Sequence, residues 1–351
     1  MKTVIEKIVS VESLKEQQKI KVAGTIIRKG GLVAFPTETV YGLGADALNP
    51  QASKGIYEAK GRPSDNPLIV HISNRKALDK IVVEIPESAK KMAEKFWPGP
   101  LTMIFKKNDK VPLETTGGLQ TVAVRMPNHP IALALIEASG GYVAAPSANT
   151  SGKPSPTTAE HVALDMNGRI PMILDGGAVG IGIESTIVDF SEEIPMILRP
   201  GYITLEMIKE VIGEVLMDPG LEDDNPRVHP KAPGMKYKHY APKADLILVD
   251  GAQEKVVSKI NDLVKEAAVS GKKTGVIGTD ETCSQYGAKF VKSIGTRNDE
   301  DTIARHLYGI LREFDELNVD IIYSESFSTP RIGQAIMNRM LKAAGHQVIE
   351  V

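Results

Sequence analysis

The chain has 351 residues, 42% of them hydrophobic, a length that suits about two domains with real cores. Its 42 lysines and arginines against 44 aspartates and glutamates give a net charge of -2, which argues against a general polyanion binder, so strong direct nucleic-acid binding is not expected. The N-terminus mixes charge into its apolar runs and the single cysteine, Cys283, excludes an internal disulfide. We therefore expect no membrane span or secretory signal, and a cytoplasmic protein.

The first predicted elements are a helix and a strand near the N-terminus. Residues 17–29 place Ile20 and Ile27 at helical spacing, and Gly30-Gly31 follows as a stop signal. The apolar run LVAFPT comes next and is predicted to form a strand.

Short apolar runs and helical patterns then alternate as far as the run PMILRPG. The other runs are LIVHI, LTMIF, TVAVRMP, YVAAPSAN, PMILDGG and STIVDF. Helical patterns such as SAKKMAEKF, IALALIEAS and TTAEHVALDM separate them. This alternation predicts a mixed α/β sheet with helices on its faces.

Two helix starts are predicted from capping residues. The helix that begins near Thr158 has a capping box in which Thr157 is the cap and Glu160 stands three residues further on. Ser73 is predicted to cap the helix in NRKALDKI.

The composition changes near residue 217. Residues 217–242 are rich in proline, glycine and charge, with little periodicity, and such a long segment is typical of a tether or a functional lid. Beyond it, the runs ADLILVDG, KTGVIGTD and VDIIYSES alternate with helices predicted at 253–269, 299–317 and 332–344. This pattern predicts a small parallel α/β domain. The predicted organisation is a catalytic domain at 1–216, a linker or lid at 217–243 and an accessory domain at 244–351.

Four basic residues stand where a ligand could bind. Lys60 and Arg62 lie in KGRPSDNPL, whose glycine and two prolines disfavour regular structure, so that the pair could hold an anion in fixed geometry. Arg125 in VAVRMP and Arg199 in ILRPG follow or end apolar runs. Ligands of open α/β sheets bind at the carboxyl ends of strands. The alternative for each is a surface charge or a structural ion pair.

Small polar residues recur in similar places. They include FPTET, Asn66 and His71, and Ser185-Thr186. Turn and cap chemistry explains most such residues. It explains APSAN less well, because Ser147 and Asn149 follow directly on the apolar run YVAA.

Common fingerprints give little support to other sites. No G-x-x-x-x-G-K-[ST] occurs, so a nucleoside triphosphate would not bind at a P-loop, and GLGADA is only a weak dinucleotide match. SNRK, SAN and KTG follow the order of the short motifs of penicillin-binding enzymes, a distant alternative in a chain without a signal sequence. The seven histidines include no close pair, so no metal site made by the protein alone is predicted.

Several longer motifs together resemble one family. FPTETVYGLGADA, KGRPSDNPL, FWPGPLT, VAVRMP, APSANTSGKPSPT, ESTIVDF, LRPG and PGMKYKHYAP are similar to motifs of the YrdC-like threonylcarbamoyl-AMP synthases in their long, two-domain form. The motifs span residues 30–242, whereas 244–351 match only in size and α/β pattern. The resemblance implies an N-terminal twisted mixed sheet with a concave cavity and a small, Rossmann-like parallel α/β domain after it.

The resemblance also implies an activity. The enzymes of this family are nucleotidyltransferases that join L-threonine, bicarbonate and ATP into threonylcarbamoyl-adenylate and release pyrophosphate. Mg2+ is expected, held mainly through the ATP phosphates. Downstream tRNA threonylcarbamoyl-transfer proteins would use the product to make threonylcarbamoyl-adenosine in tRNA.

The site residues are carried over by motif. The K-x-R and S-x-N signature of the family falls on Lys60, Arg62, Ser147 and Asn149, which would be catalytic. ATP contacts fall on Arg62, Asn66, Thr121, Ser147, Ser155, Arg199 and Tyr240. The threonine pocket falls on Thr39, His71, Arg125, Ala145 (through its backbone) and Ser185. A guanidinium offers two parallel donors to a carboxylate, which makes Arg125 the natural partner of the amino acid.

Three questions stay open at the level of sequence. The general base for the threonine amine is unassigned, because His71 fits a substrate contact and a hydrogen-bonded wall residue equally well. A domain that binds double-stranded RNA without catalysis, or one that handles carbamoyl-adenylate instead, would share many of these features. The role of the C-terminal domain is not indicated.

Overall fold

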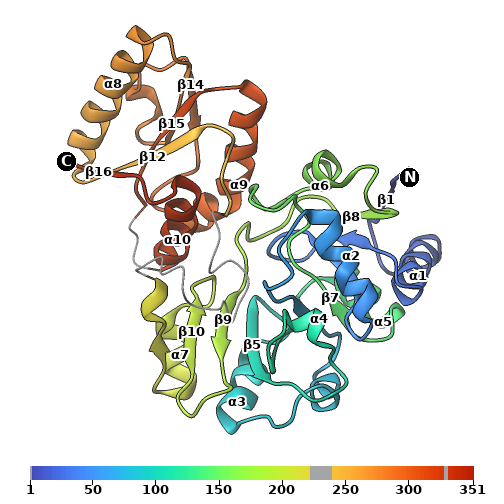
Figure 1. Ribbon diagram of the computed structural model, residues 1–351. Coiled ribbons are helices and arrows are strands. Elements are labelled where there is room, and N and C mark those ends of the chain that lie inside the picture. Colours follow the sequence, from blue (N-terminus) through green and yellow to red (C-terminus); the bar gives the residue numbers. More distant parts are fainter. Residues whose placement is uncertain (1, 222–238, 328–330) are drawn as a thin grey trace. The chain divides into compact units, whose positions relative to one another are not determined.

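The computed structural model describes residues 2–221, 239–327 and 331–351, which divide into two compact units (Figure 1). The first unit holds most of the described residues up to 221. The second holds those from 239 onward and also takes in Gly152–Pro154 and Ile181–Ile183. The predicted linker or lid at 217–243 lies largely outside the described residues.

The first unit is built on an eleven-stranded mixed sheet with the strand order β1-β8-β2-β3-β7-β4-β6-β5-β9-β10-β11. Its strands are β1 (Val4–Lys7), β2 (Val33–Phe35), β3 (Gly42–Asp46), β4 (Ile69–His71), β5 (Leu101–Lys106), β6 (Thr121–Arg125), β7 (Val143–Ala144), β8 (Met172–Asp175), β9 (Thr186–Asp189), β10 (Met196–Arg199) and β11 (Leu216–Met217). Parallel pairs such as β4 with β6 stand beside antiparallel pairs such as β5 with β6. The mixed sheet that the alternating runs predict is confirmed.

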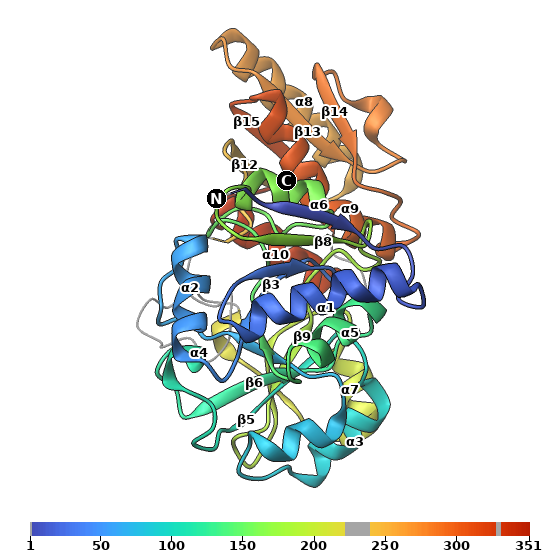
Figure 2. The ribbon, with the colours of Figure 1, turned by 90° about the vertical axis from the view of Figure 1, so that its right-hand side faces the viewer.

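Helices cover this sheet because their apolar stripes match the two faces. They are α1 (Leu14–Arg28), α2 (Pro50–Lys60), the 3-10 helix η1 (Arg75–Lys80), α3 (Glu87–Phe96), α4 (Leu113–Thr116), α5 (Pro130–Ala138), α6 (Ala159–Met166), α7 (Leu205–Ile212) and the 3-10 helix η2 (Pro219–Leu221). In Figure 2, α1 and α5 lie side by side, and Ile27 and Leu135 join Phe35 of β2 in one core. Ile56 of α2 and Met92 of α3 belong to the core on the other face.

The second unit is a five-stranded sheet in which every pair is parallel, with the order β14-β13-β15-β12-β16. Its elements are β12 (Asp245–Asp250), α8 (Gln253–Val269), β13 (Thr274–Gly278), the 3-10 helix η3 (Cys283–Gln285), β14 (Phe290–Ser293), α9 (Glu300–Leu317), β15 (Ile321–Glu325), α10 (Gly333–Ala344) and β16 (Val348–Glu350). Val256, Ile260 and Val264 of α8 pack against the sheet at helical spacing. The predicted parallel α/β domain is therefore confirmed.

Three local predictions need correction. The cap of α6 is Thr158, whose hydroxyl accepts a hydrogen bond from His161 N, and not Thr157. Asn74 rather than Ser73 caps η1, accepting from Ala77 N at 3.0 Å. Lys60 does not lie in the loop. It is the last residue of α2, and the loop starts at Gly61, whose φ of 61° gives the left-handed conformation that ends the helix.

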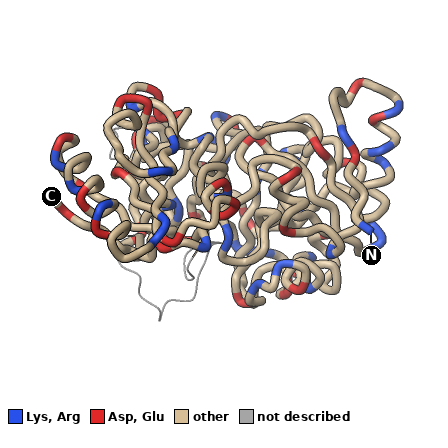
Figure 3. Tube along the Cα trace, turned by 90° about the horizontal axis from the view of Figure 1, so that it is seen from above, with Lys and Arg blue, Asp and Glu red and all other residues tan. Residues whose placement is uncertain are grey.

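Charge is distributed along both units. Figure 3 shows basic and acidic residues interspersed along the coloured part of the trace. Within that part, no helix combines the length and the apolar character needed to cross a bilayer.

Candidate active site

A row of polar side chains crosses the middle of the first sheet. Arg125 at the end of β6 is the register partner of His71 on β4 and of Thr102 on β5. Residues in register point to the same face of a sheet, so the three side chains stand on one face. Ser185, just before β9, extends the row, because its Oγ lies 2.8 Å from Thr102 Oγ1.

The same face is apolar two residues away along these strands, before His71 and Arg125 and after Thr102 and Ser185. Ile69, Ile104, Ala123, Ile187 and Leu198 form a small buried core there. Because side chains alternate with a period of two, each strand that buries one of these residues also presents its neighbour two positions away on that face. The polar row is thus fixed by the packing of the strands that carry it.

Arg125 is buried in this row, with 5% of its side chain exposed. Its Nη2 lies 2.7 Å from Glu38 Oε1, but the two atoms are not aligned for a hydrogen bond. Among the described residues, neither Nε nor Nη2 of Arg125 has a hydrogen-bond partner, although both atoms are buried. These two atoms form one edge of the guanidinium plane, which is the edge that binds a carboxylate through two parallel N–H groups.

Glu38 is held in the turn after β2. Thr37 Oγ1 accepts hydrogen bonds from the backbone N–H of Thr39 and Val40 at 3.2 and 3.3 Å. Thr37 Oγ1 also lies 2.9 Å from Thr39 Oγ1. Glu38 therefore stands between two buried threonines in a fixed turn, with 12% of its side chain exposed.

His71 is a neutral wall residue in this structure. Its ring lies edge-on to Phe35, and its Nδ1 donates to Ile69 O at 3.1 Å. Burial, together with the positive charge of Arg125, lowers the pKa of His71 to about 3. Ala145 N donates to the same carbonyl at 2.8 Å, which brings Ala145 to the row. The five residues of the predicted threonine pocket therefore lie in the polar row or next to it: His71, Arg125 and Ser185 in the row, Ala145 bonded to the carbonyl that His71 also contacts, and Thr39 in the turn that carries Glu38.

The S-x-N segment lies next to the end of α2. Lys60 Nζ contacts the carbonyl oxygens of Ser147 and Asn149, both at 2.5 Å, and only 2% of Lys60 is exposed. Ser147 Oγ donates to Asn149 Oδ1 at 2.5 Å. The charge of Lys60 is therefore directed at the backbone of the segment.

The residues predicted to contact ATP fall into smaller groups. Arg62 Nη2 donates to the carbonyls of Asn66 and Pro67 at 3.3 and 3.1 Å, and this closes the loop after α2. Asn66 Oδ1 is buried and accepts no hydrogen bond from the described residues. Thr121 begins β6 and is half-buried.

Arg199 connects two of the predicted groups. Its Nε donates to Ser185 O at 3.0 Å and its Nη2 to Ser185 Oγ at 3.2 Å, so a predicted ATP residue meets a predicted threonine residue. Ser155 Oγ donates to Glu184 Oε1 at 2.6 Å. Tyr240 belongs to the second unit, where its ring packs on Tyr308 with 5.2 Å between centroids.

Comparison with known proteins decides the family. Residues 25–201 match the Sua5/YciO/YrdC model, described as "Telomere recombination", and residues 203–345 match "Threonylcarbamoyl-AMP synthase, C-terminal domain". Threonylcarbamoyl-AMP synthases of Bacillus subtilis and Pyrococcus abyssi are 53% and 51% identical over 94% and 98% of this chain, and over 94% and 99% of their own lengths. The chain belongs to the Sua5/YrdC family.

A solved structure of this family extends the match to three dimensions. Sua5 of P. abyssi complexed with L-threonine superimposes with a TM-score of 0.94 at 49% identity, covering 99% of this chain and 100% of that one. The predicted membership of the long form of the Sua5/YrdC family and the two α/β folds are confirmed.

Three residues of the site were missed from sequence. Glu38, Thr102 and Glu184 contact Arg125, Ser185 and Ser155 respectively. Glu38 and Glu184 stand inside the motifs FPTETVYGLGADA and ESTIVDF, as the acidic residue next to a predicted threonine contact. That position could have marked them. Thr102 gives no such signal, because only the strand register brings it to Arg125.

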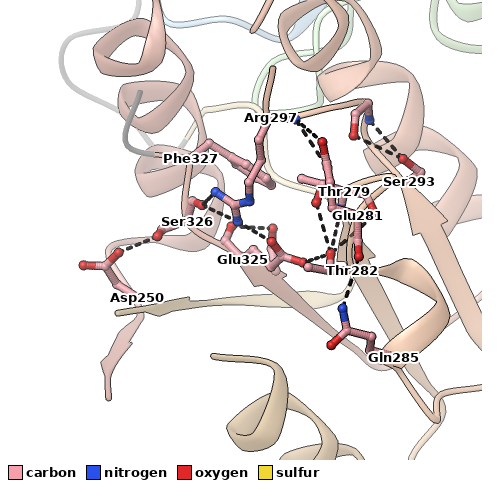
Figure 4. A network of polar contacts seen from close by, with 12 residues as sticks. Asp250, Thr279, Glu281, Thr282, Gln285, Ser293, Arg297, Glu325, Ser326 and Phe327 are labelled. Atoms are coloured by element: carbon pink, nitrogen blue, oxygen red, sulfur yellow. Dashed lines mark hydrogen bonds and ion pairs between the residues drawn. The ribbon is translucent and has the colours of Figure 1, made fainter. Parts of the chain in front are cut away.

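A second polar cluster lies in the C-terminal unit of this Sua5/YrdC chain (Figure 4). Glu325 at the end of β15 is completely buried and contacts Thr282, Tyr286 and Arg297. Arg297 also donates to Ser326 O at 3.3 Å. Burial raises the pKa of Tyr286, and the Glu325 carboxylate acts in the same direction. The contacts satisfy the buried carboxylate internally, as in a structural network.

Proposed function

We propose that this chain is a threonylcarbamoyl-AMP synthase that joins L-threonine, bicarbonate and ATP into threonylcarbamoyl-adenylate and releases pyrophosphate. Full-length similarity to proteins of that name supports the activity, and so does the related Sua5 complex with L-threonine. The product would pass to the proteins that modify tRNA, in the cytoplasm. The observation in this chain that carries the proposal is the buried edge of Arg125, whose Nε and Nη2 lack a hydrogen-bond partner among the described residues.

The amino acid would bind at the polar row. A buried guanidinium edge without a hydrogen-bond acceptor among the described residues is costly unless a ligand supplies one. The carboxylate of L-threonine supplies two oxygens in the right geometry. Thr39 and Ser185 would offer hydroxyls to the rest of the molecule, with His71 and Ala145 as walls.

ATP would bind at the segment between α2 and β4 and at the S-x-N segment. Arg62 offers charge there, and Asn66, Thr121, Ser147 and Ser155 offer hydroxyl and amide groups, a donor set that suits phosphate oxygens. Arg199 would complete the contacts within the first unit, and the predicted contact from Tyr240, which belongs to the second unit, stays a prediction. Mg2+ would be held mainly by the phosphates and water, where it neutralises charge on the leaving pyrophosphate.

The reaction would need the protein to align its substrates and would need no covalent enzyme intermediate. The threonine amine would attack bicarbonate to give a carbamate and water, and a carbamate oxygen would then displace pyrophosphate at the α-phosphorus of ATP. Oriented reactants recover roughly 7–11 kcal/mol of such a barrier, and fixed cations stabilise the charge that develops. Arg125 would hold one reactant while Arg62 and the S-x-N segment hold the other.

The test is pyrophosphate release by the purified chain, with and without L-threonine and bicarbonate, for wild type and three variants. Release should require both co-substrates. Arg125→Gln should raise the KM for L-threonine by about 10-fold or more while changing the KM for ATP little, and Arg62→Ala should do the reverse. Exposed Arg75→Gln is the control and should behave as wild type. An unchanged KM for L-threonine in Arg125→Gln would contradict the assignment, and release without L-threonine would favour carbamoyl transfer.

A further inference from the structure

Glu38 is a buried carboxylate that forms an ion pair with Arg125 but lacks hydrogen-bond donors among the described residues. Both of its carboxylate oxygens are buried, and neither accepts a hydrogen bond from the residues that the structure describes. The ion-pair contact with Arg125 Nη2 engages one oxygen without hydrogen-bond alignment. Burying a carboxylate in this way is costly unless a donor reaches it. An N–H or O–H donor from a ligand would therefore stabilise the Glu38 carboxylate.

The neighbours of Glu38 define what kind of donor fits. Arg125 Nη2, part of the edge that would bind a ligand carboxylate, lies 2.7 Å from Glu38 Oε1. A ligand anchored on that edge would therefore bring a positively charged or N–H-bearing group next to its carboxylate close to Glu38. An α-amino acid has that arrangement, because its ammonium group and its carboxylate share one carbon. The turn fixed by Thr37 holds Glu38 in place for it.

We propose that Glu38 binds the α-ammonium group of the amino-acid substrate and accepts its proton. The inference rests on the proposed function, whose threonine site it completes. Arg125 and Glu38 would then recognise the two charges of a zwitterion, one each. A molecule with only the carboxylate would lack the second contact and would place its charge beside that of Glu38.

The proton balance of the first step follows from this assignment. The ammonium group gives one proton to the Glu38 carboxylate and becomes a neutral amine. The nitrogen lone pair forms the C–N bond to bicarbonate, and the bicarbonate hydroxyl leaves as water with a second proton from the nitrogen. The carbamate keeps the negative charge that bicarbonate brought. Glu38 later returns its proton to solvent.

Two nearby histidines are poorer candidates for this role. His71 Nδ1 donates to a backbone carbonyl. Its pKa of about 3, caused mainly by burial, makes it a weak base. His129 is partly buried; burial lowers its pKa, and the charge of Glu38 opposes that shift.

The experiment compares two ligands in wild type, Glu38→Gln and Glu38→Asp. Calorimetry measures the binding of L-threonine and of 3-hydroxybutanoate, which keeps the carboxylate and hydroxyl but lacks the amine. Glu38→Gln should weaken L-threonine binding roughly 10- to 100-fold, the loss expected for a charged hydrogen bond, and leave 3-hydroxybutanoate unchanged or tighter. At saturating L-threonine its kcat should also fall, whereas Glu38→Asp should keep the preference for L-threonine. Exposed Glu94→Gln is the matched control and should equal wild type.

Other outcomes would overturn the proposal in distinct ways. Tighter binding of both ligands by Glu38→Gln would mean that Glu38 only occupies Arg125 in the empty protein. Equal weakening of both would mean that it only positions Arg125, and no effect on either would remove it from the site. If wild type itself failed to bind L-threonine, the proposed function would be at fault. Unchanged binding of 3-hydroxybutanoate also shows that the variant is folded.

Discussion

His71 and Arg125 stand side by side in the sheet, yet burial acts on them differently. Arg125 keeps its charge because a guanidinium does not lose its proton in proteins, and Glu38 lies beside it. Imidazole can lose its proton, and burial with the neighbouring charge keeps His71 neutral. Arg125 can therefore bind a ligand through its charge, whereas His71 can only contact the ligand as a neutral side chain.

The neutral His71 makes stability depend on pH. Its folded-state pKa of about 3 is below the ordinary value of 6.5, so between these values the unfolded chain binds a proton that the folded chain excludes. The contribution of neutral His71 to the free energy of unfolding is therefore complete above about pH 6.5 and is lost as the pH falls toward 3. His71→Asn, which can still donate to the Ile69 carbonyl, should show a shallower fall of Tm between pH 7 and 4. Parallel Tm curves for wild type and variant would contradict this.

At the scale of elements, the contact between α2 and the S-x-N segment separates the roles of Lys60 and Arg62. Lys60→Met keeps the length of the side chain but leaves two carbonyl oxygens, of Ser147 and Asn149, without its ammonium group. We expect the free energy of unfolding in urea to fall by about 1–3 kcal/mol. Lys54→Met, on an exposed side chain of the same helix, should change it by less than about 0.5 kcal/mol. An equal effect of both variants would exclude a specific contact.

Much of the element order could be predicted from sequence, but several contacts could not. The helices at 253–269, 299–317 and 332–344 agree with α8, α9 and α10 to within a residue, because long apolar periodicity is a strong signal. The cap of α6 was misplaced by one residue, since Thr157 and Thr158 offer the same hydroxyl. Thr157 instead lies with its Oγ1 3.2 Å from His161 Nδ1.

The site shows the same limit. The motifs predicted which segments would bind substrates. The row of His71, Arg125 and Thr102 depends on strand register, which a single sequence does not specify here. The pairing of Glu38 with Arg125 joins two motifs far apart in the chain. Lys60 was expected to hold an anion from a loop, because the glycine and two prolines of KGRPSDNPL predicted irregular structure there, whereas Lys60 ends α2.

At the scale of the whole molecule, each unit has its own core and its own polar network. Arg297→Met would leave the buried Glu325 carboxylate without its ion-pair partner, a loss that costs about 3–5 kcal/mol for a buried pair and less here, because 29% of the Arg297 side chain is exposed. The Tm of the second unit should fall while L-threonine binding stays at the wild-type value. A weakened affinity for L-threonine would contradict the assignment of the threonine pocket to the first unit alone.

The first strand of the chain is paired with one made much later. β1 forms the edge of the first sheet beside β8, and Thr3 Oγ1 donates to Ile170 O, 167 residues away. β8 in turn lies between β1 and β2. During synthesis, β1 therefore has no partner in the sheet until β8 has been made, and β2 keeps an open edge for the same period. Translation speed before β8, and chaperones that shield that edge, should influence the yield of folded protein more than changes later in the chain.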